Sequence, residues 1–254
     1  MIEQKTKTGK AGRLSLLDSI RGLTLISMIL YHALWDAVFL YGAEIGWYRS
    51  TAGFLWQQSI CWSFILLSGF CTALGSRPFR RGWTVFGCGL IVTAVTLFVL
   101  PNEPIIFGVL TFLGSAMLLS GFAKPLLDRV SPAAAVPCAA ASFFLFLFLY
   151  PTGRGYAGID GIFYVFFPRQ LYAGYGAAFL GFQPPDFVSS DYFPLLPWLF
   201  LFMTGLFAGK AMKSQFFRAF WNRGFSPLSF LGRHTLAVYL VHQPLLYLAF
   251  RLAA

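Results

Sequence analysis

Long apolar runs constrain this chain more than any other feature. A membrane-spanning helix needs about 20 apolar residues, and seven segments meet or approach that length. These segments are 15–40, 54–75, 83–100, 105–123, 133–150, 193–212 and 226–251. Hydrophobic residues make up 57% of the chain and charged residues only 11%, which is too few for a water-facing surface on all sides. The sequence therefore predicts an all-α, polytopic membrane helix bundle of about seven transmembrane helices.

The distribution of basic residues predicts how the bundle is oriented. Most Lys and Arg residues between the spans fall on one side, in segments 1–13, 77–81, 124–129 and 210–223. The positive-inside rule places that side in the cytoplasm, so we expect the N-terminus inside and the C-terminus outside. Residues 1–13 form a basic cytoplasmic segment, and 14–254 form one transmembrane domain. The first apolar run is too long for a signal peptide, so we expect it to stay in the membrane.

The outer segment 151–192 is too aromatic for a solvated loop. Its middle, GIFYVFFPRQLYAGYGAAFLGF, favours a re-entrant or interfacial helix that covers a site from outside. An eighth span is the alternative, and it would place the C-terminus inside. That arrangement would move the basic segment 210–223 outside, against the charge bias.

Composition also argues against two kinds of partner. The net charge of +10 does not predict nucleic-acid binding, because the basic residues sit in short tracts between apolar runs. No metal site is expected, since the histidines are scattered and the cysteines form no CxxC pair. We expect free thiols that fill helix contacts at Cys61, Cys71, Cys88 and Cys138.

The first apolar run carries a polar stripe. At 100° per residue, its four ionisable side chains fall within about 60° of one another around the helix; they are Asp18, Arg21, His32 and Asp36. Ionisable residues inside a bilayer cost about 2.5–3.5 kcal/mol each and are by default a functional hypothesis. The rise of about 1.5 Å per residue places His32 about 21 Å beyond Asp18, so the two ends of the stripe can serve opposite leaflets.

Each end of the stripe has a functional and a structural interpretation. Near the cytoplasm, Arg21 can pair with Asp18 or bind an anionic ligand. The structural alternative makes Asp18 an N-terminal capping or dipole residue of the helix and Arg21 a snorkelling anchor. Near the outer leaflet, Asp36 can fix the tautomer of a His32 general base. The structural alternative is an interhelical hydrogen-bonding pair.

The last predicted helix repeats this pattern. Arg233 and His234 lie in its inner half and suit phosphates or a cofactor head group. His242 and Gln243 lie at about the depth of His32 and suit a substrate with hydroxyl or amide groups. Pro244 frees a carbonyl near His242, as in helices that line cavities. The structural alternative assigns Arg233 to the positive-inside set and the outer pair to helix packing.

The outer surface offers further candidate substrate residues. Asp191 and Tyr192 precede the sixth predicted helix, and Arg169 lies in the outer segment. Carboxylates at this level can bind a sugar or an amine, although an Asp at a helix N-terminus needs no ligand to explain it. In the fourth predicted helix, Gly114 and Ser115 favour close helix contact.

Four segments in order resemble a known family of membrane enzymes. They are LDSIRGLTLISMILYHALWD, FGVLTFLGSAMLL, DYFPLLPWLFLFMTGLFAGK and FLGRHTLAVYLVHQPLL. Together they resemble the bacterial membrane proteins grouped with the catalytic domain of heparan-alpha-glucosaminide N-acetyltransferase. The opening is also similar to acyltransferase-three enzymes, whose first helix carries an Arg and a His spaced as Arg21 and His32 are. The resemblance covers roughly residues 14–250.

The resemblance implies transfer of an acyl group, usually acetyl, from cytoplasmic acyl-CoA to an acceptor across the membrane. The acceptor is commonly a sugar hydroxyl or amine, and the location implied is the bacterial inner membrane. Arg21 would lie on the acyl-CoA path and His32 at the transfer point. The chain is shorter than the lysosomal enzyme and has no large lumenal domain, so the resemblance does not name its acceptor.

The expected mechanism assigns a role to each candidate. CoA phosphates bind the inner set, which comprises Arg21, Asp18, Arg233 and His234. His32 acts as general base and Asp36 orients it, while His242 or Gln243 donates to the developing oxyanion. His242 is the alternative base, and acyl-chain length and oligomeric state stay open, with a homodimer as one option. Two other functions remain: a small-molecule or lipid transporter that uses the same stripe, and a non-catalytic binding module.

Overall fold

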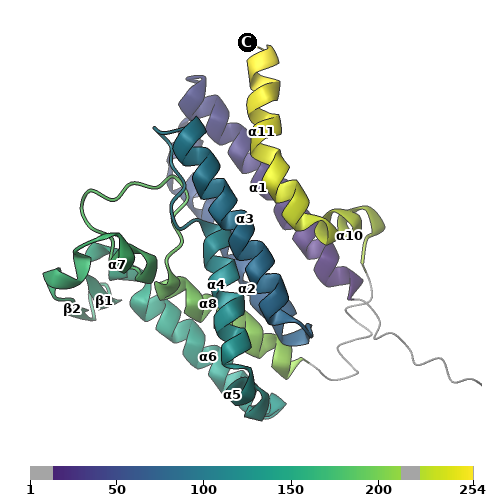
Figure 1. Ribbon diagram of the computed structural model, residues 1–254, viewed down its shortest axis with the longest axis vertical. Helices are drawn as coiled ribbons and strands as arrows, with labels where there is room; N and C mark the ends of the chain where they lie inside the picture. Colours follow the sequence, from purple (N-terminus) through teal and green to yellow (C-terminus); the bar gives the residue numbers. More distant parts are fainter. Residues whose placement is uncertain (1–13, 213–223, 254) are drawn as a thin grey trace, which may run out of the picture. The chain divides into compact units, whose positions relative to one another are not determined.

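The computed structural model describes residues 14–212 and 224–253. They belong to two compact units. Unit 1 joins the two ends of the chain, residues 1–44 and 213–254, and unit 2 comprises residues 45–212. The described part is predominantly helical, as Figure 1 shows. The prediction of a helical membrane protein is confirmed, whereas the number of spans and the orientation stay predictions.

Unit 1 is built from the first and last helices. Helix α1 (Ser15–Trp35) continues directly into a π-helical turn, η1 (Asp36–Leu40). The predicted last span is divided in two, α10 (Ser226–Arg233) and α11 (Thr235–Ala253), with a break at His234. In Figure 1, α1 is purple and the two C-terminal helices are yellow.

Glycine lets the backbones of α1 and α10 touch. A Cβ on Gly22 would lie 2.1 Å from the carbonyl oxygen of Leu228, and one on Gly232 would lie 1.8 Å from that of Asp18. Real Cβ atoms do not approach so closely, so any side chain at these positions would push the helices apart. Between the two helices, Ser19 and Ser229 lie with their hydroxyl oxygens 2.8 Å apart. This crossing positions the inner polar cluster of unit 1, which comprises Asp18, Arg21, Arg233 and His234.

Unit 2 is a bundle with α8 at its centre. Its helices are α2 (Thr51–Leu74), α3 (Pro78–Val99), α4 (Val109–Phe122), α5 (Lys124–Arg129), α6 (Pro132–Leu149) and α8 (Leu195–Ala211), preceded by the 3-10 turn η2 (Gly46–Arg49). Helix α8 packs between α2 and α6, while α3 packs on α4. The core is filled by large apolar side chains that include Ile65, Phe112, Phe146, Leu201 and Phe202. The predicted close contact at Gly114 is confirmed, since a Cβ there would lie 2.5 Å from the backbone nitrogen of Phe86.

The segment 151–192 differs from its prediction. It begins with the 3-10 turn η3 (Tyr150–Arg154), followed by an antiparallel hairpin of β1 (Tyr156–Ile159) and β2 (Phe163–Phe166). The 3-10 turn η4 (Arg169–Tyr172) and the short helix α7 (Tyr175–Leu180) complete it. The expectation of a re-entrant helix across 161–182 was therefore wrong. Gly161 adopts a φ of 79° and Pro168 removes a backbone donor, while the aromatic and β-branched run FYVF favours a strand.

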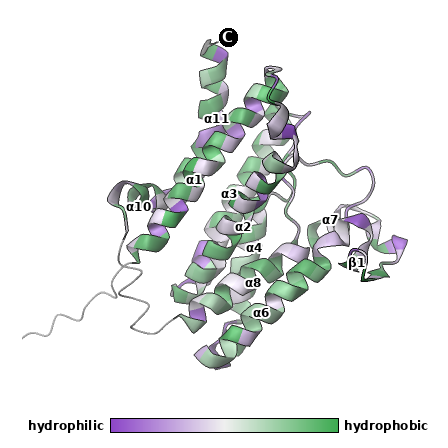
Figure 2. Cartoon of the chain, turned by 180° about the vertical axis from the view of Figure 1, so that it is seen from behind, coloured by the Kyte–Doolittle hydropathy of each residue, from purple (hydrophilic) through white to green (hydrophobic). Residues whose placement is uncertain are grey.

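Within residues 14–212 and 224–253, four helical segments are long and apolar enough to cross a membrane. They are Ser15–Leu40, Thr51–Leu74, Pro78–Val99 and Pro132–Arg154, and the shorter helices α4 and α8 are also apolar. Figure 2 shows hydrophobic residues, in green, along all of these helices. Many of their large side chains are exposed, such as Phe98 at 88% and Phe144 at 69%. Exposed apolar side chains of this size on long helices fit contact with lipid rather than water.

Candidate functional site

The outer end of α1 and the middle of α11 form one polar cluster in unit 1. The π-helical turn begins at Asp36, whose side chain is fully buried. Gln243 Nε2 donates a hydrogen bond to Asp36 Oδ1 at 2.8 Å, which ties the end of α1 to α11. The predicted contact between Asp36 and His32 is not among the hydrogen bonds of the described residues. The carboxyl group instead accepts from Gln243 of α11, although the backbone N–H of Asp36 still bonds to the carbonyl oxygen of His32 in the regular helical pattern.

The two outer histidines lie beside each other. The rings of His32 and His242 have centroids 5.0 Å apart and planes inclined by 59°. His242 Nδ1 lies 2.5 Å from the carbonyl oxygen of Tyr239. A carbonyl can only accept, so Nδ1 of His242 carries a proton, and in the neutral ring Nε2 presents a lone pair. The structure thus fixes a tautomer at His242, whereas the sequence placed that constraint on His32.

Several atoms of this cluster are buried without a hydrogen-bond partner among the described residues. They are Asp36 Oδ2, His242 Nε2 and Gln243 Oε1. Most buried polar atoms in proteins are paired, and exceptions need an explanation, such as a catalytic role or a ligand. The structural alternative, a purely interhelical hydrogen bond, accounts for Asp36 Oδ1 and Gln243 Nε2 but leaves these three atoms unexplained.

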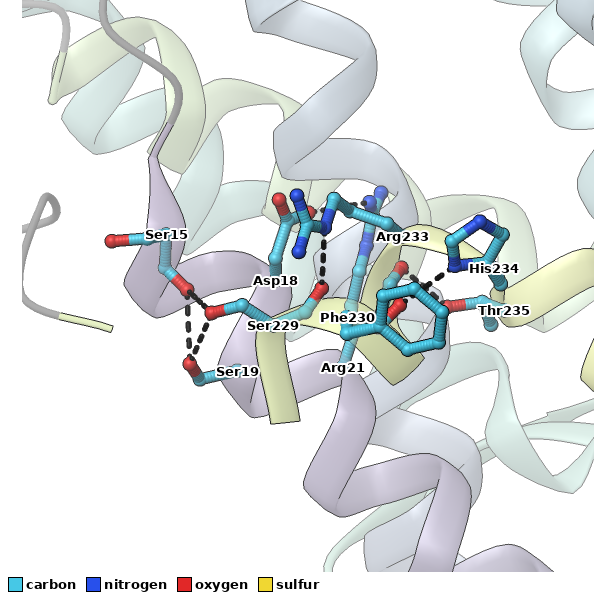
Figure 3. A network of polar contacts seen from close by, with 10 residues as sticks. Ser15, Asp18, Ser19, Arg21, Ser229, Phe230, Arg233, His234 and Thr235 are labelled. Atoms are coloured by element: carbon cyan, nitrogen blue, oxygen red, sulfur yellow. Dashed lines mark hydrogen bonds and ion pairs between the residues drawn. The ribbon is translucent and has the colours of Figure 1, made fainter. Parts of the chain in front are cut away.

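The inner cluster of unit 1 lies where α1 crosses α10 (Figure 3). The predicted pairing of Arg21 with Asp18 is confirmed, with Nη1 and Oδ1 3.7 Å apart. Asp18 does not cap α1, since Leu14 is the N-cap residue. It lies in the first turn of the helix, where a negative charge is favoured by the helix dipole, as the structural alternative expected. Asp18 is buried, whereas the Arg21 side chain keeps 20% of its surface accessible. The guanidinium of Arg21 is thus held in place but remains open to a ligand.

Residues of α10 complete this inner cluster. Arg233 Nε donates to the carbonyl oxygen of Ser229 at 3.1 Å, and its guanidinium lies 5.8 Å from the ring centroid of Phe230. His234 Nδ1 lies 2.9 Å from the carbonyl oxygen of Phe230. Both Arg233 and His234 are exposed. Figure 3 draws Arg21, Asp18 and Arg233 in one network, so the predicted inner residues are brought together.

The two clusters occupy different levels of α1. Eleven residues separate Arg21 from His32, which corresponds to about 17 Å along a helix. A basic, partly open site therefore lies at one end, and at the other lies a pair of imidazoles of which His242 is buried and His32 partly buried. This geometry suits a ligand with an anionic head group and a reactive group at the end of an extended arm.

The predicted outer residues lie in unit 2, and two of the three are hydrogen-bonded to backbone groups. Asp191 Oδ2 accepts from the backbone nitrogen of Val109 at 3.0 Å, at the start of α4. Burial raises the pKa of Asp191 to about 6, and the hydrogen bond from Val109 partly opposes that shift. Tyr192 donates its hydroxyl to the carbonyl oxygen of Ala178 at 2.5 Å, and burial raises its pKa. Arg169 lies exposed in η4.

Sequence reasoning missed one polar group inside unit 2. Gln58 Oε1 accepts hydrogen bonds from Trp62 Nε1 at 3.1 Å and from the Tyr150 hydroxyl at 3.2 Å. An indole N–H only donates, so the amide oxygen of Gln58 must face Trp62. The signal in the sequence was a pair of glutamines inside the apolar run 54–75. Amides at such depth mark helix contacts or sites.

Comparisons with known proteins give a family assignment. Neither the curated proteins nor the solved structures contain a match to this chain. A family model described as heparan-alpha-glucosaminide N-acetyltransferase, catalytic, matches residues 13–244. The match includes all of the predicted site residues. The chain therefore belongs to the family of heparan-alpha-glucosaminide N-acetyltransferase catalytic domains, integral membrane proteins with an acetyltransferase-like function.

Proposed function

We propose that this protein transfers an acyl group, most simply acetyl, from cytoplasmic acyl-CoA to an extracytoplasmic acceptor. The acceptor is a hydroxyl or amine of a sugar or a related compound. The observation that carries this proposal is the pair of polar clusters in unit 1, one with two arginines and one with two adjacent imidazoles, about 17 Å apart along α1. A bacterial inner membrane with the N-terminus inside places the arginine end toward the acyl-CoA pool.

The donor end of the site binds the phosphates of CoA. Arg21 and Arg233 supply guanidinium groups, which suit phosphate because their planar donors form paired hydrogen bonds. Asp18 holds Arg21 in place, and the carbonyl oxygen of Ser229 holds Arg233. His234 adds a further ring beside them. The acyl-bearing arm then extends along α1 toward His32.

The chemical end activates the acceptor. His32 removes the proton from the acceptor hydroxyl or amine while the oxygen or nitrogen of the acceptor attacks the thioester carbonyl. The tetrahedral intermediate collapses with loss of the CoA thiolate, which takes up the proton that His32 removed, so that the imidazole returns to its neutral form. His242 presents a lone pair at Nε2 in its neutral tautomer, so it is a second acceptor of protons and not a donor to the oxyanion.

That leaves Gln243 as the donor to the oxyanion. Its amide nitrogen carries two N–H groups, one of which is used by Asp36. The second can stabilise the negative charge on the thioester oxygen. Asp36 then acts as a positioning residue, because it fixes the Gln243 amide and not, as the spacing suggested, the His32 ring. On the acceptor side, Asp191, Tyr192 and Arg169 stay candidate substrate residues.

The test combines acetyl-CoA binding with turnover. The protein is reconstituted in liposomes, glucosamine serves as an acceptor probe with both amine and hydroxyl groups, and released CoA is measured with a thiol reagent. We expect His32→Gln to lower turnover by about 10²- to 10⁴-fold while acetyl-CoA binding is retained. Arg21→Ala and Arg233→Ala should weaken acetyl-CoA binding, whereas Arg251→Ala, at the far end of α11, should not.

Two results would contradict the proposal. Wild-type turnover in His32→Gln would remove the assigned base, and an unchanged acetyl-CoA affinity in both inner arginine variants would remove the assigned donor site. Comparing His32→Gln with His242→Gln separates the two imidazoles. The residue whose loss costs more turnover at equal acetyl-CoA affinity is the principal base.

A further inference from the structure

The hairpin of unit 2 exposes apolar side chains on both of its faces. All four residues of β2 are exposed, and side chains at alternate positions of a strand point to opposite faces. The two phenylalanines Phe163 and Phe166 are therefore on opposite faces, exposed by 59% and 71%. At the turn, Ile162 is 80% exposed. A hairpin in water would normally show one polar face, and this one has none.

The hairpin is attached directly to a helix that can cross the membrane. The span Pro132–Arg154 ends two residues before β1 begins at Tyr156. Strand β1 packs against α6, and its residue Ala157 is buried. Figure 1 shows the hairpin at the end of α6 and beside α7. The exposed side chains therefore stay within a short distance of the bilayer surface at which α6 ends.

The end of α6 next to the hairpin also exposes apolar side chains. Phe144 and Leu147, in the last turns of α6, are exposed by 69% and 38%. Such side chains on a spanning helix face lipid. Where this surface reaches the end of the helix, the hairpin adds the rings of Tyr156, Tyr164 and Phe166, which contact one another. Aromatic side chains of this kind are enriched at the boundary between head groups and acyl chains.

Charged residues of this region fit the same environment. Arg154 and Asp160 form an exposed ion pair with Nη1 and Oδ2 3.7 Å apart, and Arg169 follows the hairpin. Arginine can keep its charge among head groups while its stem covers apolar surface. The hairpin therefore fits a boundary that is apolar on one side, where the aromatic side chains lie, and polar on the other, where the charged groups lie.

We propose that the hairpin 156–166 inserts its exposed side chains into the boundary between head groups and acyl chains of the leaflet at which α6 ends. The bilayer is favoured over a second copy of the chain because the hairpin follows directly on the end of a helix that can span the membrane and that exposes apolar side chains. The insertion anchors the whole segment 150–192. Tyr172 donates to the carbonyl oxygen of Thr152 at 2.6 Å, which ties the middle of that segment back to η3.

A fluorescent label reports on the environment of the hairpin. In a background with Cys61, Cys71, Cys88 and Cys138 replaced by Ala, Ile162→Cys is labelled with the dye NBD and the protein is reconstituted in phosphatidylcholine liposomes. The matched control is Asp186→Cys, in an exposed loop outside the hairpin. We expect a blue-shifted emission at 162 relative to 186, with weak quenching by iodide. Doxyl lipids should quench it, more strongly with the doxyl group near the head group than at the methyl end, since interfacial side chains sit about 5–10 Å deep.

Each other outcome contradicts the proposal in a distinct way. Equal emission and equal iodide quenching at 162 and 186 would mean that the hairpin lies in water. A blue shift that is lost when protein is diluted with lipid would mean that a second copy covers it. A second measurement uses the unaltered protein, in which photoactivated diazirine lipids should label peptide 156–166 and not the loop that contains Asp186. Absence of label from 156–166 would overturn the proposal even if the cysteine variants do not fold.

Discussion

The hydrogen bond between Gln243 and Asp36 gives the sharpest test of how unit 1 is assembled. Replacing Gln243 by Leu leaves a fully buried carboxyl group with no donor at either oxygen among the described residues. An unsatisfied buried polar group costs about 1–3 kcal/mol, and more if it is charged. Replacing Asp36 by Leu instead leaves the amide of Gln243 without its acceptor. With both replaced by Leu, no unpaired group is left, and the change can be nearly neutral.

The cycle of single and double variants therefore has a definite expected outcome. Hydrogen bonds between membrane helices show coupling energies of about 0.6 kcal/mol on average and about 1.7 kcal/mol at most. We expect a coupling in that range, with the double variant more stable than the sum of the single changes predicts. The free energy of unfolding is measured by titrating dodecyl sulfate into mixed micelles while tryptophan fluorescence is followed.

A matched control separates this effect from simple loss of a glutamine. Gln57, in α2, makes no hydrogen bond among the described residues, so Gln57→Leu should change the free energy of unfolding by less than about 0.5 kcal/mol. If the Asp36 and Gln243 changes add within about 0.3–0.5 kcal/mol, the pair is not coupled. The contact between α1 and α11 would then not form as described.

Two further predictions concern helix contacts and pH. Gly232→Ala should lower the free energy of unfolding by about 1–3 kcal/mol, because its Cβ would lie 1.8 Å from the carbonyl oxygen of Asp18. The control Gly46→Ala, with open space around the added Cβ, should be tolerated. Equal effects of the two changes in the same dodecyl sulfate titration would contradict this account. Burial raises the pKa of Asp191 from its ordinary value of 3.8 to about 6. The stability that the protonated carboxyl contributes is therefore fully present below pH 3.8 and is lost as the pH rises through about 6. The loss in the free energy of unfolding is at most about 3 kcal/mol. Asp191→Asn should remove that loss between pH 4 and pH 7, and an unchanged pH profile of unfolding would refute the assignment.

Local patterns predicted those features that depend on neighbours along one helix. The ion pair of Asp18 and Arg21 followed from a spacing of three residues, and the structure confirms it. The predicted contact between His32 and Asp36 failed although Asp36 lies one helical turn after His32, because Gln243 of α11 supplies a donor that the spacing along one helix does not show. The outer segment 161–182 was taken for a helix because its composition is apolar and aromatic, a composition that strands share. Gly161 and Pro168 were the signals that favoured the hairpin.

The sequence by itself determined that the chain lies mostly in lipid, that it is helical and that its first helix carries a stripe of ionisable residues. Lipid requires long apolar helices, because a helix makes all of its backbone hydrogen bonds internally. Only the tertiary structure decided how those residues pair. Gln243 lies 207 residues from Asp36, and Asp191 lies 82 residues from Val109. No periodicity links positions so far apart, because such contacts form only after distant helices pack. The crossing of α1 and α10 likewise depends on two glycines whose backbones touch, and that requirement appears only once both helices are in place.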